Sequence, residues 1–201
     1  KDAGEVQEVP LYLRSRAESW MAPRQELHLS ELLAESPRGQ VYKCKWRGLE
    51  CVARVLEASP NEGEERSEHR AAMLSEISTV SRLRHPNLLL FLGASVASPT
   101  DEDQSLTILW EYLSQGTLAE VFARRRSAGN PHWRPKRPQA MDWMRCLSAA
   151  INYLHECAHP VVHGHLHPGT IMVTDEMHLK LVGYGADSAH APSLYPEASG
   201  G

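Results

Sequence analysis

The chain has 201 residues, and its 21 lysine and arginine residues against 25 acidic residues give a formal net charge of −4. Apolar residues make up 42% of the sequence, which is enough to bury a core and excludes a wholly disordered protein. The absence of a basic excess disfavours nucleic acid as the main partner, and the apolar runs fall far short of the roughly 18 residues that a membrane helix needs.

The first part of the chain combines a leader segment with short strands. Residues 1–25 hold Leu11 and Trp20 among charged residues, and we expect them to pack as a leader against the next segments of the chain. Strands are predicted at residues 26–33, 40–46 and 50–56. The dipeptide Arg47-Gly48 between the last two strands predicts a hairpin turn.

A helical pattern comes after an acidic loop at residues 59–65. Apolar residues recur every three or four positions from Ala72 to Leu83, and His85-Pro86-Asn87 should end that helix. Two more strands are predicted, at residues 88–92 and 106–110, and then a short helix from residue 116 to 122.

The second part of the chain is predicted to be mainly helical. Residues 124–137 carry six basic residues and form either a nucleic-acid patch or a solvated loop; the scarcity of aromatic residues favours the loop. An apolar stripe predicts a core helix through Met141, Met144, Leu147, Ile151 and Leu154. Short strands at 171–173 and 179–182 complete a two-lobed α+β layout.

Five short sequence motifs follow one another along the chain between residues 52 and 185. They are Val52-Ala53-Arg54-Val55, Glu76 nine residues before His85-Pro86-Asn87, Trp110-Glu111-Tyr112-Leu113, residues 163–173, and Leu181-Val182-Gly183-Tyr184-Gly185. Together they resemble a protein kinase from about residue 26 to residue 185. The short segments at residues 42–48 and 90–94 are similar to the corresponding segments in the tyrosine-kinase-like branch of serine/threonine kinases.

The resemblance implies a fold and a division of the chain. A kinase-like N-lobe with a five-stranded antiparallel sheet and one helix would span residues 26–112, after the leader at 1–25. A mainly helical C-lobe would span residues 113–201 and be truncated, because too few residues remain for its usual later helices. We expect either further chain or a partner over the apolar surface left bare.

The resemblance also identifies positions at which the residues of an active kinase are replaced. Of the glycine-rich loop only Gly39 remains, next to Glu35 and Pro37. The other replaced positions are Arg54 for the phosphate-gripping lysine, His165 for the base, His167 for the following lysine, Thr170 for the metal-binding asparagine and Gly183 for the metal-binding aspartate. Magnesium requires hard oxygen ligands. We therefore expect no phosphotransfer and a chain that is not an enzyme.

A vestigial nucleotide pocket is expected around the residues that match the family's pattern. Val41 and Ala53 would roof it, Met172 would floor it, and Trp110 would stand as a bulky gatekeeper at its back. Arg54 is expected to pair with Glu76. His163 and Tyr184 match the stacked residues that brace the two lobes, with Val80 extending the stack. No cofactor is predicted, because Trp110 and Glu35 disfavour a nucleotide.

Five histidines between residues 155 and 167 allow a metal site or a pH sensor. The structural alternative is one packed and two solvated histidines in the loop at 163–167, and we predict no metal site.

The motifs lead to one hypothesis and two alternatives. The hypothesis is a catalytically inactive pseudokinase that serves as a signalling scaffold or allosteric interaction module. The alternatives are a nucleotide-binding switch without phosphotransfer and a residual kinase with an unusual mechanism. The expected partners are proteins, such as an active kinase or a substrate of one, with no nucleic acid and no membrane insertion. Four scattered cysteines without a CxxC pair indicate reduced thiols and a cytoplasmic location.

Overall fold

The computed structural model describes residues 10–36, 38–58, 63–98, 100 and 103–184. The strands are β1 (His28–Ser36), β2 (Gly39–Trp46), β3 (Leu49–Leu56), β4 (Phe91–Ser95), β5 (Leu106–Glu111), β6 (Ile171–Val173) and β7 (Leu179–Leu181). The α-helices are α1 (Leu11–Ala17), α2 (Glu64–Val80), α3 (Leu118–Ser127) and α4 (Arg137–Glu156), and short 3-10 turns occupy Arg24–Glu26 and Pro168–Thr170.

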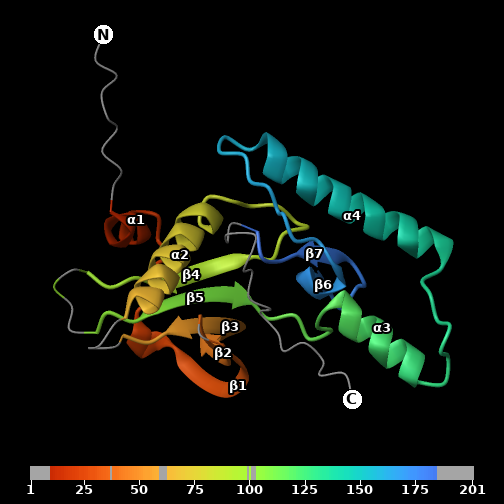
Figure 1. Cartoon of the computed structure of the whole chain (residues 1–201), viewed down its shortest axis with the longest axis horizontal. Coiled ribbons are helices and arrows are strands. Elements are labelled where there is room, and N and C mark those ends of the chain that lie inside the picture. Colours follow the sequence, from red (N-terminus) through yellow and green to blue (C-terminus); the bar gives the residue numbers. More distant parts are fainter. Residues whose placement is uncertain (1–9, 37, 59–62, 99, 101–102, 185–201) are drawn as a thin grey trace, which may run out of the picture.

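A five-stranded sheet forms the first lobe. Its strand order is β1-β2-β3-β5-β4 and all neighbouring pairs are antiparallel. The β2–β3 hairpin turns at Arg47 and Gly48, whose φ angles of 49° and 83° are those that a two-residue hairpin turn needs. The predicted five-stranded antiparallel N-lobe sheet is confirmed (Figure 1).

Helix α2 covers one face of this sheet. It begins at Glu64, earlier than the apolar pattern indicated, because Glu64 and Glu65 suit the positive end of a helix. Its buried side consists of Met73, Glu76, Ile77 and Val80. The apolar members of this set belong to the main core, which runs from the sheet into the second lobe.

The strand predicted at residues 88–92 is misplaced. The observed strand β4 begins at Phe91, and the preceding residues bond elsewhere. The backbone N–H of Leu89 donates to the carbonyl oxygen of Leu181 (2.9 Å), and that of Leu181 donates to Asn87 (2.8 Å). Leu88 and Leu89 are buried without being residues of the five-stranded sheet, because the segment they lie in joins β7 instead.

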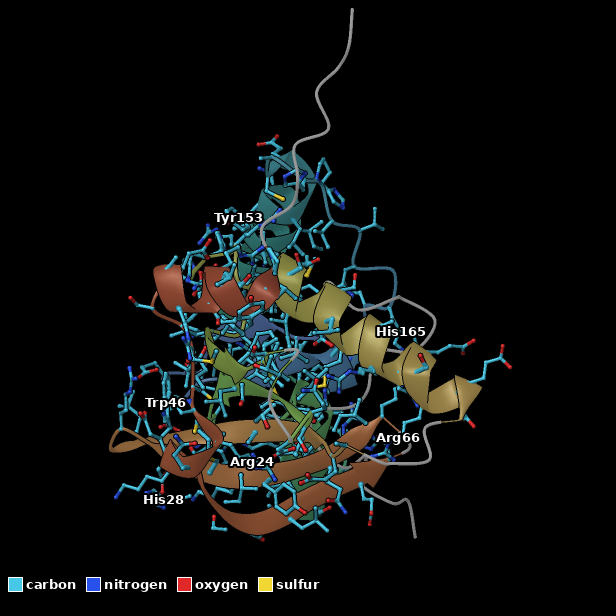
Figure 2. The ribbon with its side chains drawn as sticks, turned by 90° about the vertical axis from the view of Figure 1, so that its left-hand side faces the viewer. Arg24, His28, Trp46, Arg66, Tyr153 and His165 are labelled. Carbon is cyan, nitrogen blue, oxygen red and sulfur yellow. The ribbon has the colours of Figure 1, made fainter. Side chains whose placement is uncertain are left out.

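The second lobe contains α3, α4 and the small β6–β7 ribbon (Figure 1). Thr117 caps α3 in a capping box with Glu120, and the helix continues to Ser127. The first residues of the basic run 124–137 are therefore helical rather than loop, which corrects the shorter helix predicted from the sequence. Figure 2 places Tyr153, on α4, at the opposite end of the molecule from Arg24, His28 and Trp46 around the sheet.

The predicted core stripe of α4 is only partly buried. Met141 and Met144 are 51% and 59% exposed, and the buried residues are Trp143, Ala150 and Leu154. Trp143 fixes the rotation of the helix because its Nε1 donates to the carbonyl oxygen of Met177 (2.7 Å). Within the described ranges, none of the helices is both long enough and apolar enough to cross a membrane.

The backbone geometry of the β1–β2 turn by itself requires glycine at position 39, whether or not the turn binds a phosphate. The φ of Gly39 is 120°, and a Cβ there would lie 2.4 Å from the carbonyl oxygen of Val55. We expect Gly39→Ala to lower the free energy of unfolding by about 2 kcal/mol, measured by urea denaturation. Gly129→Ala shares the positive φ but meets no neighbouring atom, so it serves as the control. Equal losses in both variants would contradict the clash.

Candidate functional site

A buried ion pair joins the sheet to α2. Nη2 of Arg54, on β3, donates to Oε2 of Glu76, and the two residues are 3% and 5% exposed. The ion pair predicted from the sequence is present. Burial of both partners means that each charge depends on the other, since an isolated buried charge is costly.

Trp110 closes the back of the site from β5. It is 2% exposed, and its ring meets the edge of the Tyr184 ring at 6.0 Å and that of Phe91 at 5.9 Å. The Tyr184 hydroxyl donates to the carbonyl oxygen of Leu89, and burial raises the pKa of that hydroxyl. The structure thus brings Trp110 and Tyr184 together.

Two buried donors beside this cluster lack an acceptor. Nε1 of Trp110 and Nε of Arg54 make no hydrogen bond within the described part of the chain. Buried polar groups are normally paired, so these two positions are the unsatisfied points of the site.

The structure corrects one pocket residue. Val41 and Met172 belong to the same buried cluster as Trp110, but Ala53 packs in a second cluster with Cys44, on the other face of the sheet. Neighbouring strand residues point to opposite faces. Val52 therefore lies on the face of Val41, and the assignment of Ala53 to the pocket roof was shifted by one residue.

The β1–β2 turn holds the remnant of the glycine-rich loop. Oε1 of Glu35 accepts a hydrogen bond from Nε2 of Gln40 (2.8 Å), and Glu35 is exposed. Its carboxylate keeps negative charge at this turn, which disfavours phosphates. Pro37, also singled out in the sequence, lies outside the described residues.

His163 packs inside the loop at 163–170. Its Nε2 lies 2.8 Å from the carbonyl oxygen of Val182, so that nitrogen carries the proton. Desolvation lowers the pKa of this histidine, which favours its neutral form. His163 is the packed member of the histidine series.

Thr170 uses its hydroxyl within the loop itself. Oγ1 lies 3.0 and 2.9 Å from the carbonyl oxygens of His165 and His167, and the His167 N–H donates back to it (3.1 Å). His167 Nδ1 accepts from the N–H of Gly169 (3.1 Å), whereas His165 is exposed.

The loop residues do not make a magnesium site. Gly183 has no side chain, and residues 163–174 contain no Asp or Glu. Asp175, the next carboxylate, accepts from Ser114 Oγ (2.6 Å) and Gln115 Nε2 (3.1 Å). Magnesium takes hard oxygen ligands in octahedral geometry, and the residues at 163–174 and 183 do not offer that set. A magnesium nucleotide does not fit these residues.

One polar contact of the site escaped the sequence reasoning. Glu111, at the end of β5, pairs with Lys180 on β7 and accepts from the N–H of Leu90 (2.6 Å). The pair ties the connection between the two lobes to β7. Its partners are 69 residues apart and carry no local pattern, so no sequence signal could have found them.

A comparison with protein families matches most of the chain. Residues 27–198 match the family described as protein tyrosine and serine/threonine kinase.

Curated relatives agree with that match. Serine/threonine-protein kinase CTR1 of Arabidopsis thaliana is 27% identical over 87% of this chain and 20% of its own length. Serine/threonine-protein kinase 12 of the same plant is 28% identical over 88% of this chain and 36% of its own length. Probable serine/threonine-protein kinase SIS8, also of Arabidopsis thaliana, is 29% identical over 80% of this chain and 14% of its own length.

These names correct one prediction. The relatives are named as serine/threonine-protein kinases, which points to an enzyme. The prediction that this chain is not an enzyme is therefore wrong. The chain spans about a third or less of the length of these three relatives.

Proposed function

The chain belongs to the protein tyrosine and serine/threonine kinase family, and from that premise we propose that it signals by binding another protein, as a scaffold or allosteric module. The family suggests protein partners, such as an active kinase or a substrate of one. Fold alone does not fix a function, so the proposal rests on the site.

The closed back of the pocket is the observation that carries the proposal. Trp110 and Tyr184 meet edge to face, and Val41, Val52 and Met172 are at most 3% exposed. These side chains are covered by other protein atoms, and we infer that they leave no room for a nucleotide base. The intact packing then serves to hold a rigid shape that a partner protein can recognise.

Adding ATP is expected to leave the melting temperature of the protein unchanged. A ligand that binds only the folded state must raise stability, so a closed pocket predicts no shift. The measurement is a thermal-shift titration to millimolar ATP, with and without magnesium. Magnesium alone is the control for ionic effects.

A clear rise in melting temperature with ATP would overturn the closed pocket. It would favour the nucleotide-binding switch, for which the unpaired donors of Trp110 and Arg54 are the supporting observation. An acceptor atom of a bound base or phosphate could satisfy them.

Phosphotransfer is the second candidate function, and the names of the relatives favour it. The Arg54–Glu76 pair holds α2 against β3, and His165, which stands at the position of the base in the family's motif, is exposed. The test is transfer of labelled phosphate to a protein substrate by the full-length protein. Product that disappears in Arg54→Ala supports the kinase, and no product with retained partner binding supports the scaffold.

Three narrower statements belong to the same proposal. We place the chain in the tyrosine-kinase-like branch, and the segments at residues 42–48 and 90–94 support that placement. A cytoplasmic location is supported by four free cysteines. We propose a leader at 1–25 and a lobe boundary near residue 112, supported by the position of Glu111 between the sheet and β7.

A further inference from the structure

We propose that residues 10–24, here called the strap, position helix α2 and thereby hold Glu76 on Arg54. The strap includes α1 and lies beside α2 and the β4 edge of the sheet (Figures 1 and 2). This inference deepens the proposed allosteric role, but its test needs no partner and no nucleotide.

The first contact is an arginine at the end of α2. Nη2 of Arg14 donates to the backbone carbonyl oxygen of Ser78 (3.2 Å) and to the hydroxyl of Ser81. Ser78 lies in the last turn of α2, two residues beyond Glu76. Carbonyl groups in the last turn lack the usual backbone partner; that of Ser78 also accepts from the Ser81 hydroxyl (3.2 Å), and a positive charge there is favourable. Arg14 therefore fastens the end of α2 that carries Glu76.

The second contact extends the sheet. Beyond α1 the strap runs along β4, where the N–H of Ala94 donates to Trp20 (3.1 Å) and the N–H of Ala22 donates to Ala94 (2.9 Å). A Cβ on Gly93 would lie 2.6 Å from the carbonyl oxygen of Trp20. Glycine inside a strand marks a close backbone approach. Gly93 thus makes room for the strap.

The third contact reaches the site through aromatic rings. Trp20, 4% exposed, meets Phe91 edge to face at 5.7 Å. Phe91 meets Trp110 at 5.9 Å, and Trp110 meets Tyr184 at 6.0 Å. Such pairs prefer this geometry. A displaced Trp20 would deprive Phe91 of one of the two aromatic rings that the described residues place against it.

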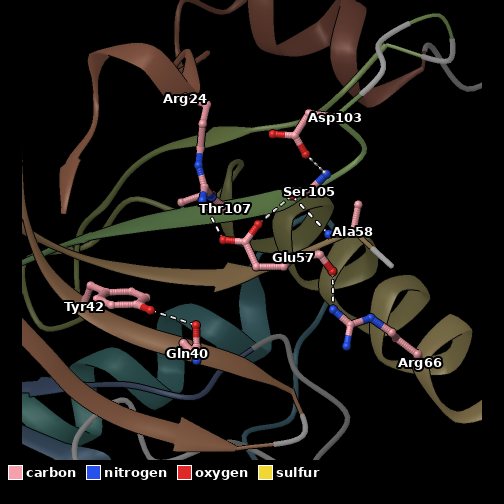
Figure 3. A network of polar contacts seen from close by, with 9 residues as sticks. All are labelled: Arg24, Gln40, Tyr42, Glu57, Ala58, Arg66, Asp103, Ser105 and Thr107. Atoms are coloured by element: carbon pink, nitrogen blue, oxygen red, sulfur yellow. Dashed lines mark hydrogen bonds and ion pairs between the residues drawn. The ribbon is translucent and has the colours of Figure 1, made fainter. Parts of the chain in front are cut away.

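The far end of the strap is anchored separately. Nη2 of Arg24 pairs with Oε1 of Glu57 (2.6 Å), and Nη1 donates to Thr107 (3.3 Å). Glu57 also accepts from the Ser105 hydroxyl (2.9 Å), and its backbone carbonyl accepts from Arg66 on α2 (Figure 3). The strap therefore contacts the C-terminal end of α2 directly, through Arg14. It contacts the N-terminal end indirectly, because Arg24 pairs with Glu57 and Glu57 accepts from Arg66.

The strap and α2 form one unit in this arrangement. Arg14 and Trp20 act as positioning residues: they touch α2 and the ring series, not the Arg54–Glu76 pair itself. A partner that removed the strap would loosen the end of α2, and with it the ion pair. Binding of a partner at the strap would in this way change the Arg54–Glu76 pair without touching it.

Hydrogen exchange on Gly93→Ala tests the strap as a whole. The added Cβ should displace the backbone at Trp20, and amide exchange at residues 76–80 of α2 should become about tenfold faster. Gly63→Ala is the control, because Gly63 has a negative φ and no atom near its Cβ, and any loss at this N-cap falls on the first turn of α2, at the other end of the helix from residues 76–80. Faster exchange confined to the strap and residue 94 would overturn the proposal.

Arg14 variants separate positioning from mere stability. Arg14→Ala should speed exchange at residues 76–80, whereas Arg16→Ala, an exposed arginine of the same helix, should not. Arg14→Lys keeps the charge and should stay within about threefold of the unmodified protein.

A double variant then tests the link to the ion pair. Arg14→Ala and Glu76→Gln should have non-additive effects on exchange at residues 76–80, since coupled residues depart from additivity. Additive effects would show that Arg14 stabilises the fold without positioning Glu76, and would refute the inference. Neither result depends on whether ATP or a partner binds.

Discussion

Truncating Trp110 to alanine is expected to lower the free energy of unfolding by about 4 kcal/mol. The indole is 2% exposed and contacts Phe91 and Tyr184, so its removal leaves a cavity between the sheet and β7. Chemical denaturation monitored by far-UV circular dichroism measures the loss.

Trp110→Phe is the matched control. The Nε1 proton of Trp110 has no acceptor within the described residues, so its loss forfeits no hydrogen bond to them. A phenyl ring keeps most of the contacts, and we expect a loss below about 1.5 kcal/mol. Equal losses in both variants would show that the ring contacts do not carry the stability.

Removing the carboxylate of Glu76 is expected to have the second large effect. Glu76→Ala leaves the guanidinium of Arg54 buried without its acidic partner, which costs about 3–5 kcal/mol. Urea unfolding measures the change. Glu68→Ala, at an exposed position on the same helix, should change stability by less than about 0.5 kcal/mol.

Replacing both partners distinguishes a stranded charge from lost packing. Arg54→Met with Glu76→Leu removes both charges and keeps apolar volume, and such replacements are often neutral or stabilising. We expect the double variant to unfold at higher urea than Glu76→Ala. A double variant as unstable as the single one would mean that the ion pair itself, not the stranded arginine, stabilises the fold.

The sequence alone determined the architecture, because local patterns encode it. The apolar runs of β2 and β3, the turn at Arg47-Gly48 and the apolar periodicity of α2 indicated the elements and their order. The motifs around Glu76 and residues 163–173 indicated the family, and the Arg54–Glu76 pair was expected from that resemblance.

Single-residue assignments were less secure where two registers are compatible with one pattern. The apolar run at residues 51–56 is buried on both faces, so its composition alone does not show which residues face α2. The expected pairing of Arg54 with Glu76 does show it, because strand residues alternate between faces and Val52 therefore shares the face of Arg54, whereas Ala53 lies on the opposite face. The start of the strand predicted at residues 88–92 is wrong for a different reason: Leu88 and Leu89 are apolar and buried, but their segment bonds to β7, and only Phe91 and Leu92 belong to β4.

Only the tertiary structure decided the contacts between distant residues. Arg14 with Ser78, Trp20 with Phe91, and Glu111 with Lys180 each join segments more than 60 residues apart. Side chains at such separations show no spacing rule, because the folded backbone, not the order of residues, brings them together. The sequence therefore specified α2 and its glutamate, and the packing of the strap, β4 and β5 against it decided how Glu76 is held.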